Sequence, residues 1–112
     1  MKKIVIIPAY NEQNNIINVV NDLMLNAPCF DYVIINDGST DDTISLCLEN
    51  NLNVVNLPVN LGIGACVQTG YIYALENGYD IAVQFDGDGQ HEAKYLEGMY
   101  KEMIETGSDM VI

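Results

Sequence analysis

Short apolar runs alternate with segments of helical periodicity along the whole chain, and this alternation constrains the fold more than any other feature. Continuous apolar runs are typical of strands buried on both faces of a parallel sheet. They predict strands at residues 4–7, 32–35, 54–57 and 81–85, and the start of a fifth at 111–112. Helical spacing of the apolar residues predicts helices near residues 11–27, 39–50, 65–76 and 92–105. Because parallel strands need crossover connections, we predict a Rossmann-like α/β fold, a mostly parallel sheet with helices on both faces.

The length of the chain fits one small domain. It has 112 residues, of which 49% are hydrophobic and 18% charged, a balance that favours a globular domain with a core. Neither a repeat nor a linker interrupts it, so residues 1–112 are expected to form one continuous domain. The terminal Asp109–Ile112 segment reads as a strand that has just begun, and we therefore expect a truncated piece of something longer.

The charge balance limits the partners that the chain can bind. Sixteen acidic and four basic residues give a formal net charge of -12. Because this charge would repel the phosphates of nucleic acid, we expect no nucleic-acid partner. The same charge repels a nucleoside diphosphate unless a divalent cation, Mg²⁺ or Mn²⁺, or basic residues outside this chain intervene. The simpler alternative is that the charge only aids solubility.

The cysteines indicate neither a disulfide framework nor a zinc site. Cys29, Cys47 and Cys66 are odd in number and widely spaced, so buried free thiols in a reducing cytoplasm are expected. The first apolar run stops at Pro8, which makes it too short for a signal peptide.

Polar residues follow each predicted strand. In open parallel sheets ligands bind beyond the carboxyl ends of the strands, so these residues outline the expected site. The four segments are 8–12, 36–39, 58–64 and 86–91.

Asp86-Gly87-Asp88 is the most informative of these segments. Two carboxylates flanking a glycine suit Mg²⁺ or Mn²⁺, which in turn binds diphosphate oxygens, and Gln90 or His91 could add a ligand. The alternative is an acidic turn with a helix cap, but the place directly after a buried parallel strand favours the metal site.

The other segments allow two interpretations each. Asp37 could accept hydrogen bonds from a base or ribose or form a local turn, and Glu12 could bind ribose or stabilise a helix N-terminus. Tyr10 could stack on a base or cover the sheet edge. Gly62 and Gly64 resemble a phosphate loop, which is weak evidence alone. The dinucleotide fingerprint and the P-loop motif are both missing, which argues against those two classes.

Four ordered motifs together resemble glycosyltransferase family 2, in its dolichyl-phosphate mannose synthase-like branch. The motifs are Ile4-Val5-Ile6-Ile7-Pro8-Ala9-Tyr10-Asn11-Glu12, Ile35-Asn36-Asp37-Gly38-Ser39-Thr40-Asp41, Asn60-Leu61-Gly62-Ile63-Gly64 and Asp86-Gly87-Asp88-Gly89-Gln90-His91. The resemblance covers nearly the whole chain and implies the N-terminal, nucleotide-sugar-binding part of a GT-A fold.

The resemblance also implies roles for individual residues. The nucleotide-binding set is Pro8, Ala9, Tyr10, Asn11, Glu12, Ile35, Asp37, Gly62, Gly64, Asp86 and Gly87. Asp86 and Asp88 match the family's Asp-x-Asp motif, and the implied metal ligands are Asp86, Asp88 and Gln90.

The implied activity is transfer of a sugar from a UDP- or GDP-linked donor to an acceptor such as a polyprenyl phosphate or a glycan, with Mg²⁺ or Mn²⁺. We expect a cytoplasmic protein, peripheral to the inner face of the membrane when complete, and leave a homo-oligomer open. A truncated, non-catalytic nucleotide- and metal-binding module is the alternative. A phosphoacceptor receiver domain is disfavoured because Pro8-Ala9-Tyr10 stands where that chemistry needs an acid pair.

Overall fold

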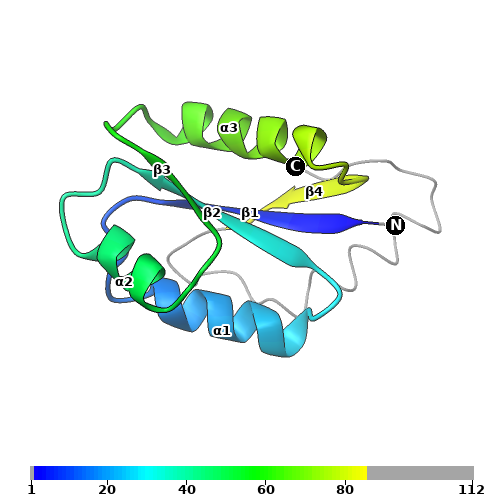
Figure 1. The fold of residues 1–112 in the computed structure, drawn as a ribbon, viewed down its shortest axis with the longest axis horizontal. Coiled ribbons are helices and arrows are strands. Elements are labelled where there is room, and N and C mark those ends of the chain that lie inside the picture. Colours follow the sequence, from blue (N-terminus) through cyan, green and yellow to red (C-terminus); the bar gives the residue numbers. More distant parts are fainter. Residues whose placement is uncertain (1, 86–112) are drawn as a thin grey trace.

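The computed structural model describes residues 2–85, which fold into four strands and three helices (Figure 1). In chain order the elements are β1 (Lys3–Ala9), α1 (Ile16–Asn26), β2 (Asp31–Asp37), α2 (Thr43–Glu49), β3 (Val54–Leu57), α3 (Ile63–Glu76) and β4 (Ile81–Gln84). All four strands predicted within this range are confirmed. The helix predicted at 92–105 and the strand beginning at 111–112 lie outside the described residues.

The four strands form one parallel sheet in the order β3-β2-β1-β4. At its centre Val5 of β1 pairs with Tyr32 of β2 on one side and with Val83 of β4 on the other. The chain moves outward from β1 to β3 and then crosses back to place β4 beside β1. The order therefore reverses between β1 and β4, and such a reversal is where parallel sheets open a crevice for ligands.

Helices cover both faces of the sheet, as predicted. Figure 1 shows α1 and α2 on one side and α3 on the other. Val5 and Ile7 pack with Leu23 of α1 in one apolar cluster, whereas Ile4 and Ile6 pack with Cys66 of α3 in the other. Since successive side chains of a strand point to opposite faces, a strand covered on both sides must be apolar throughout. This explains the uninterrupted apolar run of β1.

Helix α3 lies unusually close to the central strand. Gly70 is buried in the middle of α3, and a Cβ atom there would come within 2.3 Å of Ile6 Cγ2. A glycine is therefore required at this point of contact.

Three expectations are wrong in detail. Helix α2 begins at Thr43 rather than near Ser39, because residues 39–42 form a loop that bonds the segment after β1. Helix α1 begins at Ile16 rather than at Asn11, because the intervening residues form turns and Asn11 has a φ of 54°. Cys29 is exposed in the turn between α1 and β2, while Cys47 and Cys66 are buried free thiols as predicted. In residues 2–85 we find no helix with the length and hydrophobicity required to traverse a bilayer.

Candidate functional site

Three loops meet at the carboxyl ends of β1, β2 and β3, and we call them together the carboxyl-end rim. They comprise residues 10–15, 38–42 and 58–62. Strand β4 runs toward the same edge, because it is parallel to β1 and Phe85 donates its N–H to the carbonyl of Ile6 at 2.9 Å. The described residues thus bring together the first three of the four polar segments that the sequence predicted.

The first two loops of the rim are joined by their backbone N–H groups. Three consecutive N–H groups after β1 donate to side-chain oxygens that come from the start of α2 and the loop before it. The pairs are Asn11 with Ser39 Oγ at 3.0 Å, Glu12 with Thr43 Oγ1 at 2.9 Å and Gln13 with Asp41 Oδ2 at 3.3 Å. These bonds fix residues 11–13 against the second loop and the start of α2. They do not compete with α1, because the N–H groups of a first helical turn have no acceptor within the helix.

Hydrogen bonds also run in the opposite direction. Asn11 Oδ1 accepts from the N–H groups of Thr40 at 2.8 Å and Asp41 at 3.3 Å, and Gln13 Oε1 accepts from Asp42 N–H at 2.9 Å. Asparagine tolerates the left-handed backbone conformation that Asn11 adopts. We call this reciprocal set of bonds between residues 11–13 and 39–43 the loop clasp. It occupies the Asn11 and Gln13 acceptor oxygens.

Asp41 and Thr43 form the centre of the clasp. Asp41 Oδ1 accepts from Thr43 N–H at 2.9 Å and from Thr43 Oγ1 at 2.5 Å. Burial acts to raise the pKa of the Asp41 carboxyl, but the hydrogen bonds from Thr43 and Gln13 outweigh it and hold that pKa below its ordinary value. The carboxylate form is therefore the one that the clasp stabilises.

Asp37 anchors the third loop of the rim. Its side chain is 4% exposed, and its two oxygens accept from the N–H groups of Leu61 at 2.7 Å and Gly62 at 3.0 Å. Asn60 Nδ2 also donates to the Asp37 carbonyl at 3.2 Å. Gly62 precedes α3, so the carboxylate also lies at the positive end of that helix, where it is stabilised.

The second and third loops are also packed backbone against backbone. Gly38 has a φ of 63°, and a Cβ atom there would lie 2.4 Å from both Asn60 N and Val59 C. Cys66 of α3 is a neighbour of Asp37. Burial and the Asp37 carboxylate raise the pKa of the Cys66 thiol to about 11. The Cys66 thiol is therefore protonated and neutral at neutral pH.

The predicted nucleotide-binding residues differ in how much of them a ligand could reach. Pro8, Ala9 and Ile35 are buried in adjacent strands, with Pro8 paired to Ile35, so only their main chain borders the rim. The Tyr10 side chain is 45% exposed. Glu12 is half-buried, and its carboxylate accepts one hydrogen bond, from Asn15 Nδ2 at 3.2 Å.

The two glycines predicted to bind nucleotide lie at the start of α3. Gly62 has a φ of 98°, a conformation that favours glycine, whereas Gly64 is exposed in the first turn. Apart from their own chain neighbours, no heavy atom of residues 2–85 lies within 4 Å of a Cβ built at either one. Both therefore border open space beside the rim.

The predicted metal ligands cannot be placed against this rim. Asp86, Gly87, Asp88, Gln90 and His91 lie outside the described residues. Across residues 2–85, no three histidine, cysteine, aspartate or glutamate side chains are grouped to hold a metal ion.

Sequence reasoning missed the contribution of Thr43, which is 0% exposed and bonded to both Glu12 and Asp41. A signal is present in the Ser39-Thr40-Asp41-Asp42 segment, whose side chains are typical caps of a helix N-terminus. Asp41 does accept the Thr43 N–H, but the segment also binds the loop after β1.

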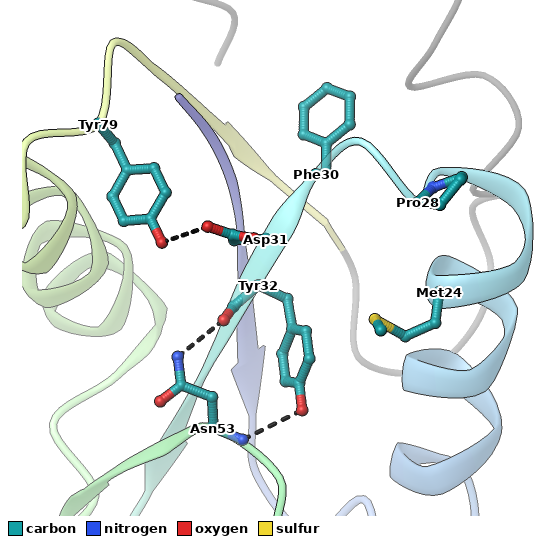
Figure 2. Close-up of a pocket in the computed structure, with 7 residues that line it drawn as sticks. All are labelled: Met24, Pro28, Phe30, Asp31, Tyr32, Asn53 and Tyr79. Carbon is teal, nitrogen blue, oxygen red and sulfur yellow. Dashed lines mark hydrogen bonds between the residues drawn. The ribbon is translucent and has the colours of Figure 1, made fainter. Parts of the chain in front are cut away.

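A pocket detected in the described residues lies at the opposite end of the sheet (Figure 2). We call the residues around the strand starts the amino-end edge: Lys2, Phe30, Asp31, Tyr32, Asn53 and Tyr79. There Tyr79 OH donates to Asp31 Oδ2 at 2.6 Å, and Asn53 Nδ2 donates to the carbonyl of Tyr32 at 2.9 Å (Figure 2). This pocket does not coincide with the rim that the topology favours for ligands.

Comparison with known proteins adds independent information about the family and the fold of this chain. The family model described as glycosyl transferase family 2 matches residues 4–112. The UDP-N-acetylglucosamine–dolichyl-phosphate N-acetylglucosaminyltransferase of Methanococcus voltae is 37% identical over 124 residues, covering 96% of this chain and 49% of that protein. The chain spans about half the length of the curated relatives that it matches.

Two solved structures share the fold. TarS from S. aureus, in complex with UDP-GlcNAc, gives a TM-score of 0.72 with 26% identity over 94% of this chain and 32% of that chain. The Mycobacterium tuberculosis glucosyl-3-phosphoglycerate synthase, in complex with Mn²⁺, UDP and glucosyl-3-phosphoglycerate, gives 0.61 with 25% identity over 77% of this chain and 33% of that chain. The predicted GT-A fold is thereby confirmed.

Proposed function

Since this chain belongs to glycosyl transferase family 2, we propose that its carboxyl-end rim binds a nucleoside diphosphate sugar whose sugar is transferred to an acceptor. The observation that carries the proposal is that some polar side chains of the rim are engaged in bonds between the loops, whereas others stay accessible to a ligand. The clasp engages the acceptor oxygens of Asn11 and Gln13 but leaves the Tyr10 and Glu12 side chains accessible beside the reversal of strand order.

The accessible groups suit a nucleoside. In this proposal the Tyr10 ring stacks on the base, and the Glu12 carboxylate accepts hydrogen bonds from ribose hydroxyls. The Asp37 oxygens accept two backbone N–H groups and the Cys66 thiol also hydrogen-bonds this carboxylate, but a carboxylate has about four acceptor positions, which leaves capacity for a base N–H. The buried main chain of Pro8, Ala9 and Ile35 forms the bottom of the proposed nucleoside site.

The diphosphate needs a different partner. Dinucleotide-binding folds hold a pyrophosphate on free N–H groups at the first helix N-terminus. Here the N–H groups of Asn11, Glu12 and Gln13 donate to side-chain oxygens, and those of Leu61 and Gly62 donate to Asp37. These five N–H groups are therefore not free to bind phosphate, and Asp37 opposes an anion near Gly62 and Gly64.

We therefore assign the diphosphate to a Mg²⁺ or Mn²⁺ ion held by Asp86, Asp88 and Gln90, with Gly87 allowing close approach of the backbone. Carboxylate and amide oxygens are suitable ligands for either ion. When bound, the cation would neutralise the diphosphate as leaving group. The Mn²⁺ and UDP named in the solved glucosyl-3-phosphoglycerate synthase complex support this assignment.

The acceptor that we propose is a polyprenyl phosphate, with a glycan as the other option. The support is the dolichyl phosphate in the name of the M. voltae relative. Because such an acceptor is anchored in a bilayer, the protein would act at the inner face of the membrane as a peripheral protein.

Calorimetric titration with UDP and GDP, each with and without Mn²⁺, tests the donor site. We expect one nucleotide to bind with Mn²⁺ and to lose most of its affinity when EDTA removes the metal. Tyr10→Ala should weaken binding about tenfold through loss of stacking, a value expected for one base–aromatic contact. No heat for either nucleotide would refute the proposal.

Turnover of the matching nucleotide sugar with a short polyprenyl phosphate tests the chemistry in the full-length protein. We expect Asp88→Ala to abolish metal-dependent transfer, while Asp80→Ala, at the amino end of β4, should leave it unchanged. Binding without any turnover would favour the non-catalytic module instead.

A further inference from the structure

The backbone of Glu12 is fixed by a residue that no ligand can reach. Thr43 is the first residue of α2, and its hydroxyl accepts the Glu12 N–H at 2.9 Å. The same hydroxyl donates its proton to Asp41 Oδ1. One buried hydroxyl thus satisfies a donor of the first rim loop and an acceptor of the second.

Accepting the donor site proposed above, on which this inference rests, we propose that Thr43 is a positioning residue for donor binding. It acts through Glu12, and it touches neither the nucleotide nor the metal. Being 0% exposed, its side chain is separated from any bound molecule by the loop that it holds.

The geometry explains why one hydroxyl has this effect. Glu12 follows Asn11, whose left-handed backbone turns the chain away from β1. The Glu12 carbonyl already accepts the N–H of Ile16 at 2.9 Å, so the backbone of Glu12 is held by α1 on one side and by Thr43 on the other. Without the Thr43 hydroxyl the Glu12 N–H would lose its partner, and the backbone that carries the carboxylate would be held less firmly at the rim.

The remaining bonds of the clasp support the same conformation from both sides of Glu12. Asn11 Oδ1 holds the N–H groups of Thr40 and Asp41, and Gln13 N–H is held by Asp41 Oδ2. Asn11 was predicted to bind nucleotide. Its acceptor role in the clasp gives it the same positioning function as Thr43.

The first experiment compares Thr43→Val with Thr43→Ser in the full-length protein. Valine keeps the shape but removes the hydroxyl, whereas serine keeps the hydroxyl. We expect valine to raise the donor KM about tenfold, a change typical of a slightly displaced binding group, and serine to stay within about threefold of the wild type. Thr69→Val is the matched control, because the Thr69 hydroxyl donates to the Ala65 carbonyl within α3, away from the loop clasp.

A double-mutant cycle tests whether Thr43 acts through Glu12. If it does, Thr43→Val should add little to the KM increase of Glu12→Ala, since residues that act as one unit are not additive. Fully additive losses would overturn the inference, and so would a Thr43→Val variant with wild-type KM.

A second pair of variants serves if Thr43→Val does not fold. Asn11→Gly accepts the left-handed backbone but loses the acceptor oxygen, whereas Asn11→Asp keeps both. We expect the glycine variant to raise the donor KM about tenfold and the aspartate variant to rescue it. Equal losses in the two would indicate direct donor contact by the Asn11 amide and would contradict the positioning role.

These outcomes are distinguishable from failure of the proposed function. If the wild-type protein binds no nucleotide with Mn²⁺, the donor site itself is wrong. If it binds and the Thr43 and Asn11 variants bind equally well, only the positioning role is wrong.

Discussion

The two ends of the sheet differ in the hydrogen bonds that hold their loops and strand ends together. At the carboxyl-end rim, loops are joined through side chains that bond neighbouring backbone, as in the clasp and in the two bonds of Asp37. At the amino-end edge, bonds between exposed groups join the strand starts to each other and to the end of α3, such as Tyr79 with Asp31 and Lys2 with the Asn77 carbonyl. The difference lies in burial: the rim is held by buried side chains such as Asp37 and Thr43, and the opposite edge by exposed ones.

This difference indicates where sequence changes should matter. A change in the rim leaves backbone groups unpaired and shifts a loop that borders the donor site. A change at the amino-end edge returns a polar group to water. We therefore expect rim variants to alter both stability and donor binding, and edge variants to alter stability slightly and donor binding not at all.

The largest effect should come from Gly38→Ala. The added methyl group would overlap Asn60 N and Val59 C, and the left-handed backbone adds strain. Together these should lower the free energy of unfolding by about 3 kcal/mol and weaken donor binding. Urea unfolding and nucleotide titration would measure the two effects.

Gly78→Ala is the matched control at the amino end of β4. Gly78 also has a positive φ of 74°, but within the described part of the chain a Cβ atom there would meet nothing within 4 Å. Strain alone should cost about 1 kcal/mol and leave donor affinity unchanged. Equal losses of unfolding free energy and donor affinity in the two variants would contradict the predicted difference between the carboxyl-end rim and the amino-end edge.

Asp37→Ala should have the next largest effect. It leaves the N–H groups of Leu61 and Gly62 without partners, which should cost about 2 kcal/mol and release the third rim loop. Asp31→Ala removes an exposed carboxylate at the other edge and should cost less than about 1 kcal/mol. Thermal melts of the pair compare them directly, and a larger loss for Asp31→Ala would reverse the predicted order.

The smallest effect should appear as a dependence on alkaline pH. The ordinary pKa of a cysteine thiol is 9.0, and that of Cys66 is about 11 in the folded protein, so the unfolded chain loses this proton first. The contribution of Cys66 to stability is then complete below pH 9.0 and falls as the pH rises toward about 11.

Cys66→Ala should remove that part of the alkaline loss. Tyr79→Phe serves as its counterpart at the amino-end edge, because burial and Asp31 raise the pKa of Tyr79 to about 12. Its removal should affect the loss that begins near the ordinary pKa of 10.0 and runs to about 12, a window that starts and ends above that of Cys66. Unfolding titrations at intervals between pH 8 and 12 would separate the two groups. An unchanged pH profile in Cys66→Ala would contradict the assignment.

The sheet and its layers could be predicted from the sequence because they depend on local patterns. The run Ile4–Ile7 and the runs at 32–35, 54–57 and 81–85 all became strands of one parallel sheet. Burial on both faces permits only such runs, and the crossover rule then fixes the layers.

The starts of the helices could not be predicted in the same way. Local sequence favours a helix from Asn11, but Asn11 adopts a left-handed backbone and its side chain bonds the N–H groups of Thr40 and Asp41, which lie 29 and 30 positions away. Likewise, Asp37 could be placed at the rim from its position after β2, yet its bonds to Leu61 and Gly62 depend on how the third loop folds back. The roles of Asp86, Asp88 and Gln90 stay predictions.

The loop clasp also makes the rim measurable without any ligand. The amide protons of Asn11, Glu12 and Gln13 are held by side chains of a separate loop, not by a helix of their own. Their exchange with deuterium should therefore report how often the two loops part, independently of fraying in α1. If the two loops rarely separate, the rim already has its binding conformation before the ligand arrives. Binding would then require little loss of chain entropy.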